Sequence, residues 1–307
     1  MNNGIVIHGN QVVSKDCDNL WAGLFSVVNP DGPIIKFIVS HLPPDITLAI
    51  PRCDGALLLK NDEYFEDNKG NQYHIKPVIQ IKNPKFILGT LAQFTEDPAI
   101  NYLYLPLDDR TFEYGITSIL PQNTTPWNQR SSELCWVGSC SGKCNNVTGP
   151  DDWSGPDDWS GDSLRVRFVK MLYQNNPKVR LSQWWSENQN IPHELFGNRV
   201  DYTEFLKYKI FFIVDGAVIA SNHQWGFASG CVPFVISNAK CWFLQFARPF
   251  IDYIPIKHDL SNLIQQIEWV KNNDTEAGKI ANNALLFSKK YFSSEFQKEY
   301  LLKCLNI

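Results

Sequence analysis

The chain has 307 residues, of which 44% are hydrophobic and 13% aromatic, and its formal net charge is −4. This composition is typical of a globular protein with one large domain or two medium ones. The charge is not gathered into a basic stripe, so nucleic-acid binding is not expected. No apolar run in the sequence approaches the roughly 18 residues of a membrane-spanning helix.

The N-terminal part alternates short apolar runs with turns, which indicates a strand-rich α/β region. Its runs are "GIVIHG", "IIKFIVSHL", "ITLAI", "ALLLK", "PVIQI", "FILGTLAQF" and "YLYLPL". The stretch "NTTPWNQR", from Asn123 to Arg130, is polar, contains a proline and has no period. We therefore expect a linker there.

A further apolar run, "LCWVGS" from Leu134, ends in small residues and is followed by a duplicated hexapeptide, "GPDDWSGPDDWSG", from Gly149. Two copies are too few for a repeat architecture, and the density of Pro, Gly and Asp excludes a regular element. The duplication is therefore either an expanded solvated loop or a lid that carries Trp153 or Trp159 over a bound sugar.

Several stretches have helical periodicity. "SLRVRFVKMLYQNN" predicts a helix with one face made of Leu164, Phe168, Met171 and Leu172. "DLSNLIQQIEWVKNND" predicts another, behind an Asp cap, with a stripe made of Leu260, Leu263, Ile264 and Ile267. "TEAGKIANNALLFSKKYF" and "SSEFQKEYLLKCL" predict the next two helices.

The most informative stretch is "YKIFFIVDGAVIASNHQWGFASGCVPFVI", from Tyr208 to Ile236. An apolar strand, Ile210 to Val214, breaks at Asp215-Gly216 and passes through small residues before a second apolar run begins. Ligands of open α/β sheets bind outside the carboxyl ends of strands, and a helix that starts there presents N–H groups to an anion such as a diphosphate. Glycine lets the backbone approach a phosphate closely. A buried strand followed by an ordinary tight turn would give the same pattern.

Eight cysteines are scattered along the chain, at positions 17, 53, 135, 140, 144, 231, 241 and 304. Their spacing does not suggest a disulfide framework, so we expect free thiols. Cys140 and Cys144 form a C-x3-C pair, but no second pair follows at zinc-site spacing. No metal site is expected.

Taken in order, "LCWVGSCSG", "SLRVRFVKML", "YKIFFIVDGAVIAS" and "YIPIKHDLSNL…WVKNND" resemble the CAP10-like (Rumi-type) protein O-glucosyltransferase and xylosyltransferase family, glycosyltransferase family 90. The resemblance runs from about Pro44 to the C-terminus and is weakest between Lys60 and Glu133. It implies an α/β fold of GT-B type, with two Rossmann-like lobes and an interlobe cleft. Residues 1–125 would form the acceptor-side lobe, 131–280 the UDP-sugar-binding lobe, and 281–307 a helix returning to the first lobe.

The resemblance also implies an activity: inverting transfer of xylose or glucose from a UDP-sugar to a hydroxyl of a glycan or protein acceptor. No tightly bound cofactor and no divalent metal would be required. Inversion needs one general base, and a carboxylate suits this role. In "PPDITLAIPRCDG", Asp54 matches the strand-end Asp of the family. Asp54 could instead be an ordinary turn residue before Gly55. Asp45 is the other carboxylate that could serve as the general base.

On the donor side, the small residues after the run "LCWVGS" match the phosphate loop of the family. An arginine at the start of the next helix matches the family Arg, which would neutralise the leaving diphosphate. These residues are Ser139, Ser141, Gly142 and Arg165. The turn in the second half of the chain would add Gly216, Ala220, Ser221, Asn222 and His223. The family usually has an arginine where this chain has Asn222. The substitution implies either altered donor contacts or weakened activity.

Two other functions stay open at this point. One is a carbohydrate-binding protein with a catalytically decayed transferase fold, which Asn222 favours. The other is a metal-dependent GT-A transferase that uses Asp108 and Asp109 as a carboxylate pair. The start of the chain, "MNNGIVIHGNQVV", has no signal-peptide pattern. It therefore looks like a viral or microbial cytoplasmic version of the family, in the host cytoplasm if viral.

Overall fold

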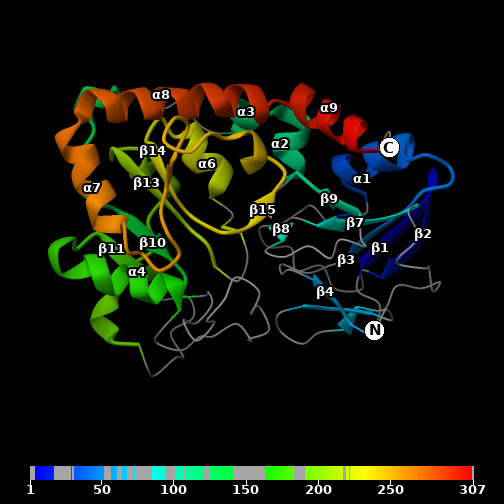
Figure 1. Ribbon diagram of the computed structural model, residues 1–307, viewed down its shortest axis with the longest axis horizontal. Coiled ribbons are helices and arrows are strands. Elements are labelled where there is room, and N and C mark those ends of the chain that lie inside the picture. The colour runs from blue at the N-terminus through cyan, green and yellow to red at the C-terminus, as the bar shows by residue number, and fades with distance from the viewer. Residues whose placement is uncertain are drawn as a thin grey trace. The chain divides into compact units, whose positions relative to one another are not determined.

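The computed structural model describes residues 4–16, 29, 31–51, 57–60, 64–67, 72–73, 85–90, 92–93, 101–106, 108–119, 125–140, 163–182, 191–216, 219–220 and 222–305. The fold is mixed α/β, as expected from the sequence, with several small sheets and their helices (Figure 1). The chain divides into two compact units. The first comprises Met1–Ile119, Ala239–Gln245 and Tyr291–Ile307, and the second comprises Leu120–Asn238 and Phe246–Lys290.

The first unit is built on a five-stranded sheet of order β2-β1-β3-β7-β9. β1 is antiparallel to β2 and β3, whereas β3, β7 and β9 run parallel. The bounds of these strands are Gly4–His8 (β1), Gln11–Asp16 (β2), Thr47–Pro51 (β3), Phe86–Thr90 (β7) and Asn101–Tyr104 (β9). Smaller pairings join β4 (Leu57–Lys60), β5 (Tyr64–Asp67) and β6 (Gln72–Tyr73), and β8 (Ala92–Gln93) with β15 (Lys240–Cys241).

Helices of the first unit are α1 (Pro33–His41), α2 (Asp109–Tyr114), α3 (Ile116–Ile119) and α9 (Ser294–Leu305). The apolar run "IIKFIVSHL" thus forms the helix α1 rather than a strand. Pro33 opens the helix, where its missing N–H costs nothing, and Ile34, Ile35 and Ile38 are buried on one face.

The C-terminal helix α9 is attached to the first unit by side-chain bonds that span almost 200 residues of sequence. Gln297 donates through Nε2 to the carbonyl oxygen of Thr111 at 2.8 Å, and the Tyr300 hydroxyl donates to the carbonyl oxygen of Tyr104 at 2.9 Å. An aromatic cluster of Trp242, Phe243, Phe292 and Tyr300 packs beside these bonds with mainly edge-on and tilted ring contacts. The last helix is therefore part of the core of this unit.

The second unit contains two parallel three-stranded sheets, β10-β11-β12 and β13-β14-β16. Their bounds are Trp136–Gly138 (β10), Val179–Ser182 (β11), Phe196–Gly197 (β12), Ile210–Val214 (β13), Val232–Ile236 (β14) and Ile254–Pro255 (β16). All residues of β13 and β14 are buried, which matches the continuous apolar runs seen in the sequence.

The helices of the second unit are α4 (Leu164–Leu172), α5 (Tyr202–Phe205), α6 (His223–Ala228), α7 (Leu263–Asn272) and α8 (Asp274–Tyr291). Short 3-10 turns occur at Trp127–Gln129 (η2), Tyr173–Asn175 (η3), His193–Leu195 (η5) and Leu244–Phe246 (η6). Among the described residues, no helix is both long and apolar enough to cross a membrane.

A stack of aromatic rings connects the two sheets of the second unit. Trp136 of β10 meets Phe168 of α4 at 5.3 Å, Phe168 meets Phe212 of β13 at 5.1 Å, and Phe212 meets Phe234 of β14 at 5.5 Å, all edge to face. These four side chains are buried in one hydrophobic cluster. Edge-to-face pairs add about 0.5–1.5 kcal/mol each beyond area burial, so this stack fixes where the ends of β10 and β13 lie relative to each other.

Two helix predictions need correction in detail. Met171 is 47% exposed, because the buried face of α4 instead includes Val166 and Val169 beside Leu164, Phe168 and Leu172. In the segment before α7, Leu260 is buried ahead of the helix with a φ of 63°, and Ile264 is 49% exposed. The buried stripe of α7 is Leu263, Ile267 and Val270, and Asp259 accepts from the Ser261 N–H instead of capping the helix.

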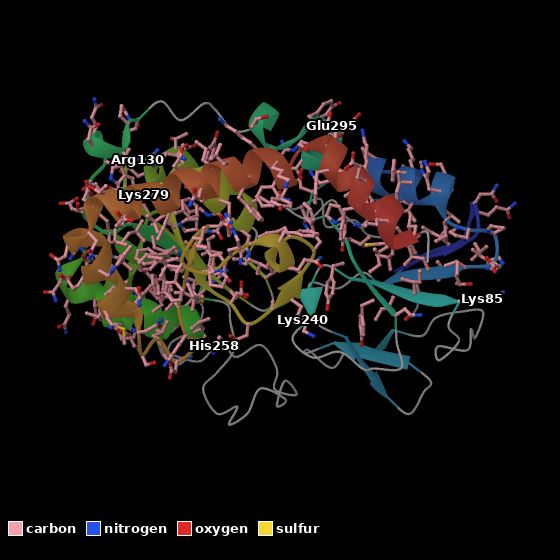
Figure 2. All side chains as sticks on the ribbon, turned by 45° about the horizontal axis from the view of Figure 1, so that its top comes forward. Lys85, Arg130, Lys240, His258, Lys279 and Glu295 are labelled. Carbon is pink, nitrogen blue, oxygen red and sulfur yellow. The ribbon has the colours of Figure 1, made fainter. Side chains whose placement is uncertain are left out.

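The expected linker is only partly described. Its second half forms η2 and leads to Arg130, which is buried rather than solvated (Arg130 is labelled in Figure 2). Arg130 donates through Nη2 to the Ser229 carbonyl oxygen at 3.2 Å and through Nη1 to Cys231 Sγ at 2.9 Å. These bonds make the end of this stretch an integral part of the second unit.

Asp109 should make the stability of the protein depend on pH. Its side chain is buried and accepts the Ile34 N–H at the start of α1, and burial raises the pKa of Asp109 to about 6. In the unfolded chain an Asp titrates near 3.9, so the folded state holds this proton over a pH range where the unfolded state has lost it. The stabilising effect of the bound proton is complete below about pH 4 and lost as the pH rises to about 6.

We expect Asp109→Asn, which cannot ionise but keeps the acceptor for Ile34, to gain about 1–3 kcal/mol of stability relative to wild type between pH 4 and pH 7. Urea unfolding at several pH values measures this difference. Asp45→Asn is the matched control with the opposite sign, because a bond from Lys85 lowers the pKa of exposed Asp45. Parallel pH curves for wild type and Asp109→Asn would contradict the assignment.

Candidate functional site

Two predicted site residues meet at the end of a third element, where β10 and β13 end. Ser139 follows β10, Arg165 lies in the first turn of α4, and Val214 is the last residue of β13. Arg165 donates through Nη1 to Ser139 Oγ at 2.8 Å, and through Nε and Nη2 to the Val214 carbonyl oxygen at 3.1 and 3.0 Å. One guanidinium thus connects the carboxyl ends of strands from both parallel sheets.

The start of α4 is held in place by a serine cap. Ser163 Oγ accepts the Val166 N–H and donates to the carbonyl oxygen of Cys140, which is next to Ser139. A serine cap stabilises a helix start by about 1 kcal/mol. Here the cap also ties the helix to the chain that leaves β10, so the position of Arg165 is set by the backbone on both sides.

The charge of Arg165 is maintained at neutral pH. Burial lowers the pKa of Arg165 to about 10, while the negative charge of Asp215 acts in the opposite direction. A pKa near 10 leaves the guanidinium protonated at pH 7. Arg165 therefore provides a fixed positive charge at the ends of the strands, which is what an anionic ligand would need.

Asp215 organises the turn that follows β13. Its Oδ1 accepts the Ala220 N–H at 2.9 Å and lies 3.2 Å from His223 Nε2. Both Asp215 and His223 are buried. The Ala220 N–H is therefore used inside the protein, and His223 contacts Asp215 instead of lying at the surface.

Asn222, the residue that replaces the expected arginine, faces the strand. Its Nδ2 donates to the carbonyl oxygen of Phe212 at 3.4 Å, and its Oδ1 has no hydrogen-bond partner in the described part of the chain. Gly216 is half-buried at the start of the same turn. The structure thus joins Ser139 to Arg165, and Arg165 to the end of β13. Ala220 and His223 contact Asp215, the residue that follows β13, and Asn222 contacts Phe212 within the strand.

Four candidates lie outside the described residues: Asp54, Ser141, Gly142 and Ser221. The duplicated hexapeptide, with Trp153 and Trp159, also lies outside them. The described cysteines, Cys135, Cys140, Cys231, Cys241 and Cys304, are free thiols, and Cys144 of the C-x3-C pair is not described.

Comparison with known proteins places the chain in a family. The model of glycosyl transferase family 90 matches residues 121–307, more than half of the chain. The chain belongs to glycosyl transferase family 90. The resemblance inferred from the sequence is thereby confirmed, and Ser139, Arg165 and the turn after β13 all lie within the matched segment, whereas Asp54 precedes it.

Individual relatives match over shorter segments. Uncharacterized protein 179R of Invertebrate iridescent virus 6 is 33% identical over 103 residues, 31% of this chain and 9% of the relative. Protein O-glucosyltransferase 2 of Danio rerio is 32% identical over 99 residues, 31% of this chain and 19% of the relative. Protein O-glucosyltransferase 1 of Homo sapiens is 25% identical over 131 residues, 41% of this chain and 33% of the relative. The chain thus matches a third or less of the length of each of these relatives.

The carboxylates that were rival candidates in the sequence analysis have structural partners. Asp45 precedes β3 and forms an exposed ion pair with Lys85, which is labelled in Figure 2, at 2.9 Å. Asp108 caps α2 by accepting the Arg110 and Thr111 N–H groups, and Asp109 accepts from α1. Within the described ranges, no three His, Cys, Asp or Glu side chains form a group that could hold a metal ion.

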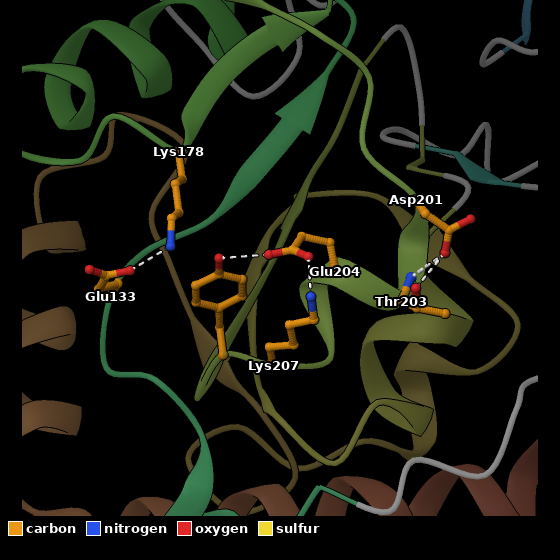
Figure 3. A network of polar contacts seen from close by, with 7 residues as sticks. Glu133, Lys178, Asp201, Thr203, Glu204 and Lys207 are labelled. Carbon is orange, nitrogen blue, oxygen red and sulfur yellow. Dashed lines mark hydrogen bonds and ion pairs between the residues drawn. The ribbon is translucent and has the colours of Figure 1, made fainter.

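A second polar cluster lies at the opposite ends of the strands. Lys178, just before β11, pairs with Glu133 at 2.7 Å, and the hydroxyl of Tyr208, just before β13, donates to Glu204 at 3.0 Å. Lys178, Glu133 and Glu204 are labelled in Figure 3. Lys178 and Glu133 are exposed, so their pairing contributes about 0–1 kcal/mol. Parallel α/β sheets bind ligands at the carboxyl ends, so this cluster at the amino ends is structural.

Asp215 is the residue of this site that sequence reasoning missed. The sequence marks it only as the point where the apolar strand breaks before Gly216. A carboxylate directly after a buried parallel strand is a usable signal, because the carboxyl end of such a strand is where ligand sites form. Its bond to Ala220 depends on the course of the turn, which the pattern of residue types does not specify.

Proposed function

We propose that this family 90 chain is an inverting glycosyltransferase that moves glucose or xylose from a UDP-sugar to a hydroxyl of a glycan or protein acceptor. The observation that supports this most directly is the fixed cationic contact of Arg165 with the ends of β10 and β13, inside the segment that matches the family. Several relatives carry the name protein O-glucosyltransferase, which favours glucose as the sugar and protein as the acceptor.

The proposal assigns the two halves of the chain different roles. Residues 131–280 would bind the UDP-sugar and residues 1–125 the acceptor, in a GT-B arrangement, with residues 281–307 belonging to the acceptor side. Ser139, Ser141, Gly142, Arg165 and the turn from Gly216 to His223 would surround the diphosphate. Because the Ala220 N–H donates to Asp215, the diphosphate would take its donors from other groups of this set.

The chemistry needs two charges of opposite sign. As the sugar–oxygen bond to UDP breaks, negative charge develops on the leaving diphosphate, and the Arg165 guanidinium would stabilise it. On the acceptor side, Asp54 would take the proton of the attacking hydroxyl, so that attack on the opposite face of the sugar carbon inverts its configuration. Divalent metal would not be required, since the protein supplies the cation.

Donor screening tests the proposal. We expect purified protein to bind UDP in calorimetry and to release UDP from UDP-glucose or UDP-xylose, with the same rate in EDTA. Proton NMR of the transferred sugar should show an anomer opposite to that of the donor. A protein that does not bind UDP or any UDP-sugar would refute the proposed function. Retention of the donor configuration would refute the inverting mechanism.

A second function is favoured by one observation. Asn222 brings no charge to the turn, and its amide faces Phe212. A chain that has lost a diphosphate cation could persist as a carbohydrate-binding protein of the same fold. The two functions differ in a simple result: the binding protein takes up UDP-sugar or glycan in calorimetry but releases no UDP over hours.

A further inference from the structure

The Asp215 carboxylate is buried, and the unfavourable free energy of this burial needs an explanation. The residue is 2% exposed, and its Oδ2 has no hydrogen-bond partner among the described residues. Burying a carboxylate without full pairing is unfavourable by several kcal/mol. An apolar residue at the end of β13 would avoid this penalty, so the carboxylate is expected to serve more than packing.

The side-chain bonds of Asp215 lead to two residues of the candidate site. Oδ1 accepts the N–H of Ala220, five residues further on, which closes the turn into a ring. The same oxygen contacts Nε2 of His223, the first residue of α6. On the other side, the carbonyl oxygen of neighbouring Val214 accepts two bonds from Arg165. Asp215 is therefore next to the residue that binds Arg165 and itself binds Ala220 and His223.

We propose that Asp215 is a positioning residue for donor binding, which fixes Ala220 and His223 relative to the carboxyl end of β13. This inference rests on the proposed function. Asp215 has no role as a ligand contact, because its Oδ1 is engaged inside the turn and its side chain is buried. A carboxylate would also repel a diphosphate, so the gain from Asp215 must come through the placement of Ala220 and His223.

Asp252 offers a matched control in the same unit. It is also 2% exposed, and Arg248 donates to it through the backbone N–H at 2.8 Å, Nε at 2.9 Å and Nη2 at 3.0 Å. Asp252 thus has the same burial and also closes a short turn, but its side-chain partner, Arg248, lies outside the candidate site. Substitutions of Asp215 and Asp252 should have similar effects on stability and different effects on the affinity for UDP.

The experiment measures UDP binding by calorimetry and thermal unfolding for Asp215→Ala, Asp215→Asn, Asp252→Ala and Asp252→Asn. We expect Asp215→Ala to bind UDP about tenfold more weakly or worse, because nothing then accepts the Ala220 N–H. Asp215→Asn keeps an oxygen for that N–H and should stay within about threefold of wild type. In steady-state assays the loss in Asp215→Ala should appear in the donor KM more than in kcat. Both Asp252 variants should bind UDP like wild type despite lower melting temperatures.

Each contrary result has a definite meaning. Wild-type UDP affinity in Asp215→Ala overturns the positioning role while the proposed function stands. Equal losses in Asp215→Ala and Asp252→Ala show a general effect of stability and also overturn it. If Asp215→Asn binds UDP as weakly as Asp215→Ala, loss of the bond to Ala220 is not the cause, and the positioning role as proposed is overturned. If Asp215→Ala does not fold, Asp215→Ser, polar but too short to reach Ala220, takes its place under the same criteria. Absence of UDP binding in wild type is the separate result that refutes the proposed function itself.

Discussion

Replacing Asp54 with Asn should lower the rate of sugar transfer by about 10²–10⁴-fold and leave the affinity for UDP close to that of wild type. Asparagine keeps the size of aspartate but cannot accept the proton of the attacking hydroxyl. UDP affinity should not change, because a general base acts on the acceptor and not on the leaving group. Initial rates with UDP-glucose and UDP-xylose, together with UDP calorimetry, measure both quantities.

The position of Asp54 after β3 supports its choice over Asp45. β3 lies in the middle of the five-stranded sheet and runs parallel to β7 and β9, and Asp54 follows its last residue, Pro51. Asp45 precedes the same strand and is paired with Lys85. In the sequence, Asp54 follows the carboxyl end of β3 and Asp45 precedes its amino end, and ligands of parallel sheets bind at the carboxyl ends of strands.

Asp45→Asn is therefore the matched control for Asp54→Asn, and we expect it to transfer sugar at the wild-type rate. Turnover of Asp54→Asn at the wild-type rate would remove Asp54 as the base. Loss of UDP binding along with activity would point instead to a folding defect, which circular dichroism and thermal unfolding of the same samples would detect.

Replacing Arg165 with Ala should weaken UDP binding by about 1.5–3 kcal/mol, which is roughly 10- to 150-fold in Kd. The substitution removes the positive charge at the ends of β10 and β13. It also removes three bonds that connect Ser139 to the Val214 carbonyl oxygen. Both changes reduce affinity for an anion, and the second also lowers the stability of the second unit.

Two further variants separate charge from geometry. Arg165→Lys keeps the charge but cannot donate to Ser139 and twice to Val214 at once, so we expect an affinity between those of wild type and Arg165→Ala. Arg180→Ala is the control, because Arg180 of β11 lies over the Tyr173 ring at 4.1 Å and belongs to no part of the candidate site. Unchanged UDP affinity in Arg165→Ala, measured by calorimetry on folded protein, would exclude Arg165 from donor binding.

The sequence by itself determined the elements whose residues carry a local pattern. β13 and β14 are predicted from apolar runs of Ile, Val and Phe, and α8 and α9 from helical periodicity, because burial of a strand or a helix face leaves its period in the chain. The family also follows from the sequence, since its motifs are short and contiguous. Ser139 and Arg165 are named as partners in one site on this basis alone.

Only the tertiary structure decided the features that depend on pairing between distant segments. The run "IIKFIVSHL" suits a strand or a helix, and its helical form buries Ile34, Ile35 and Ile38 together. Asp109 accepts the Ile34 N–H, a contact across 75 residues. In the site, the Val214 carbonyl oxygen holds Arg165, and Asp215 takes the Ala220 N–H. A hydrogen bond depends on direction and on distances within a few tenths of an ångström, which residue types along a chain do not encode, so these contacts emerge only once the strands are packed.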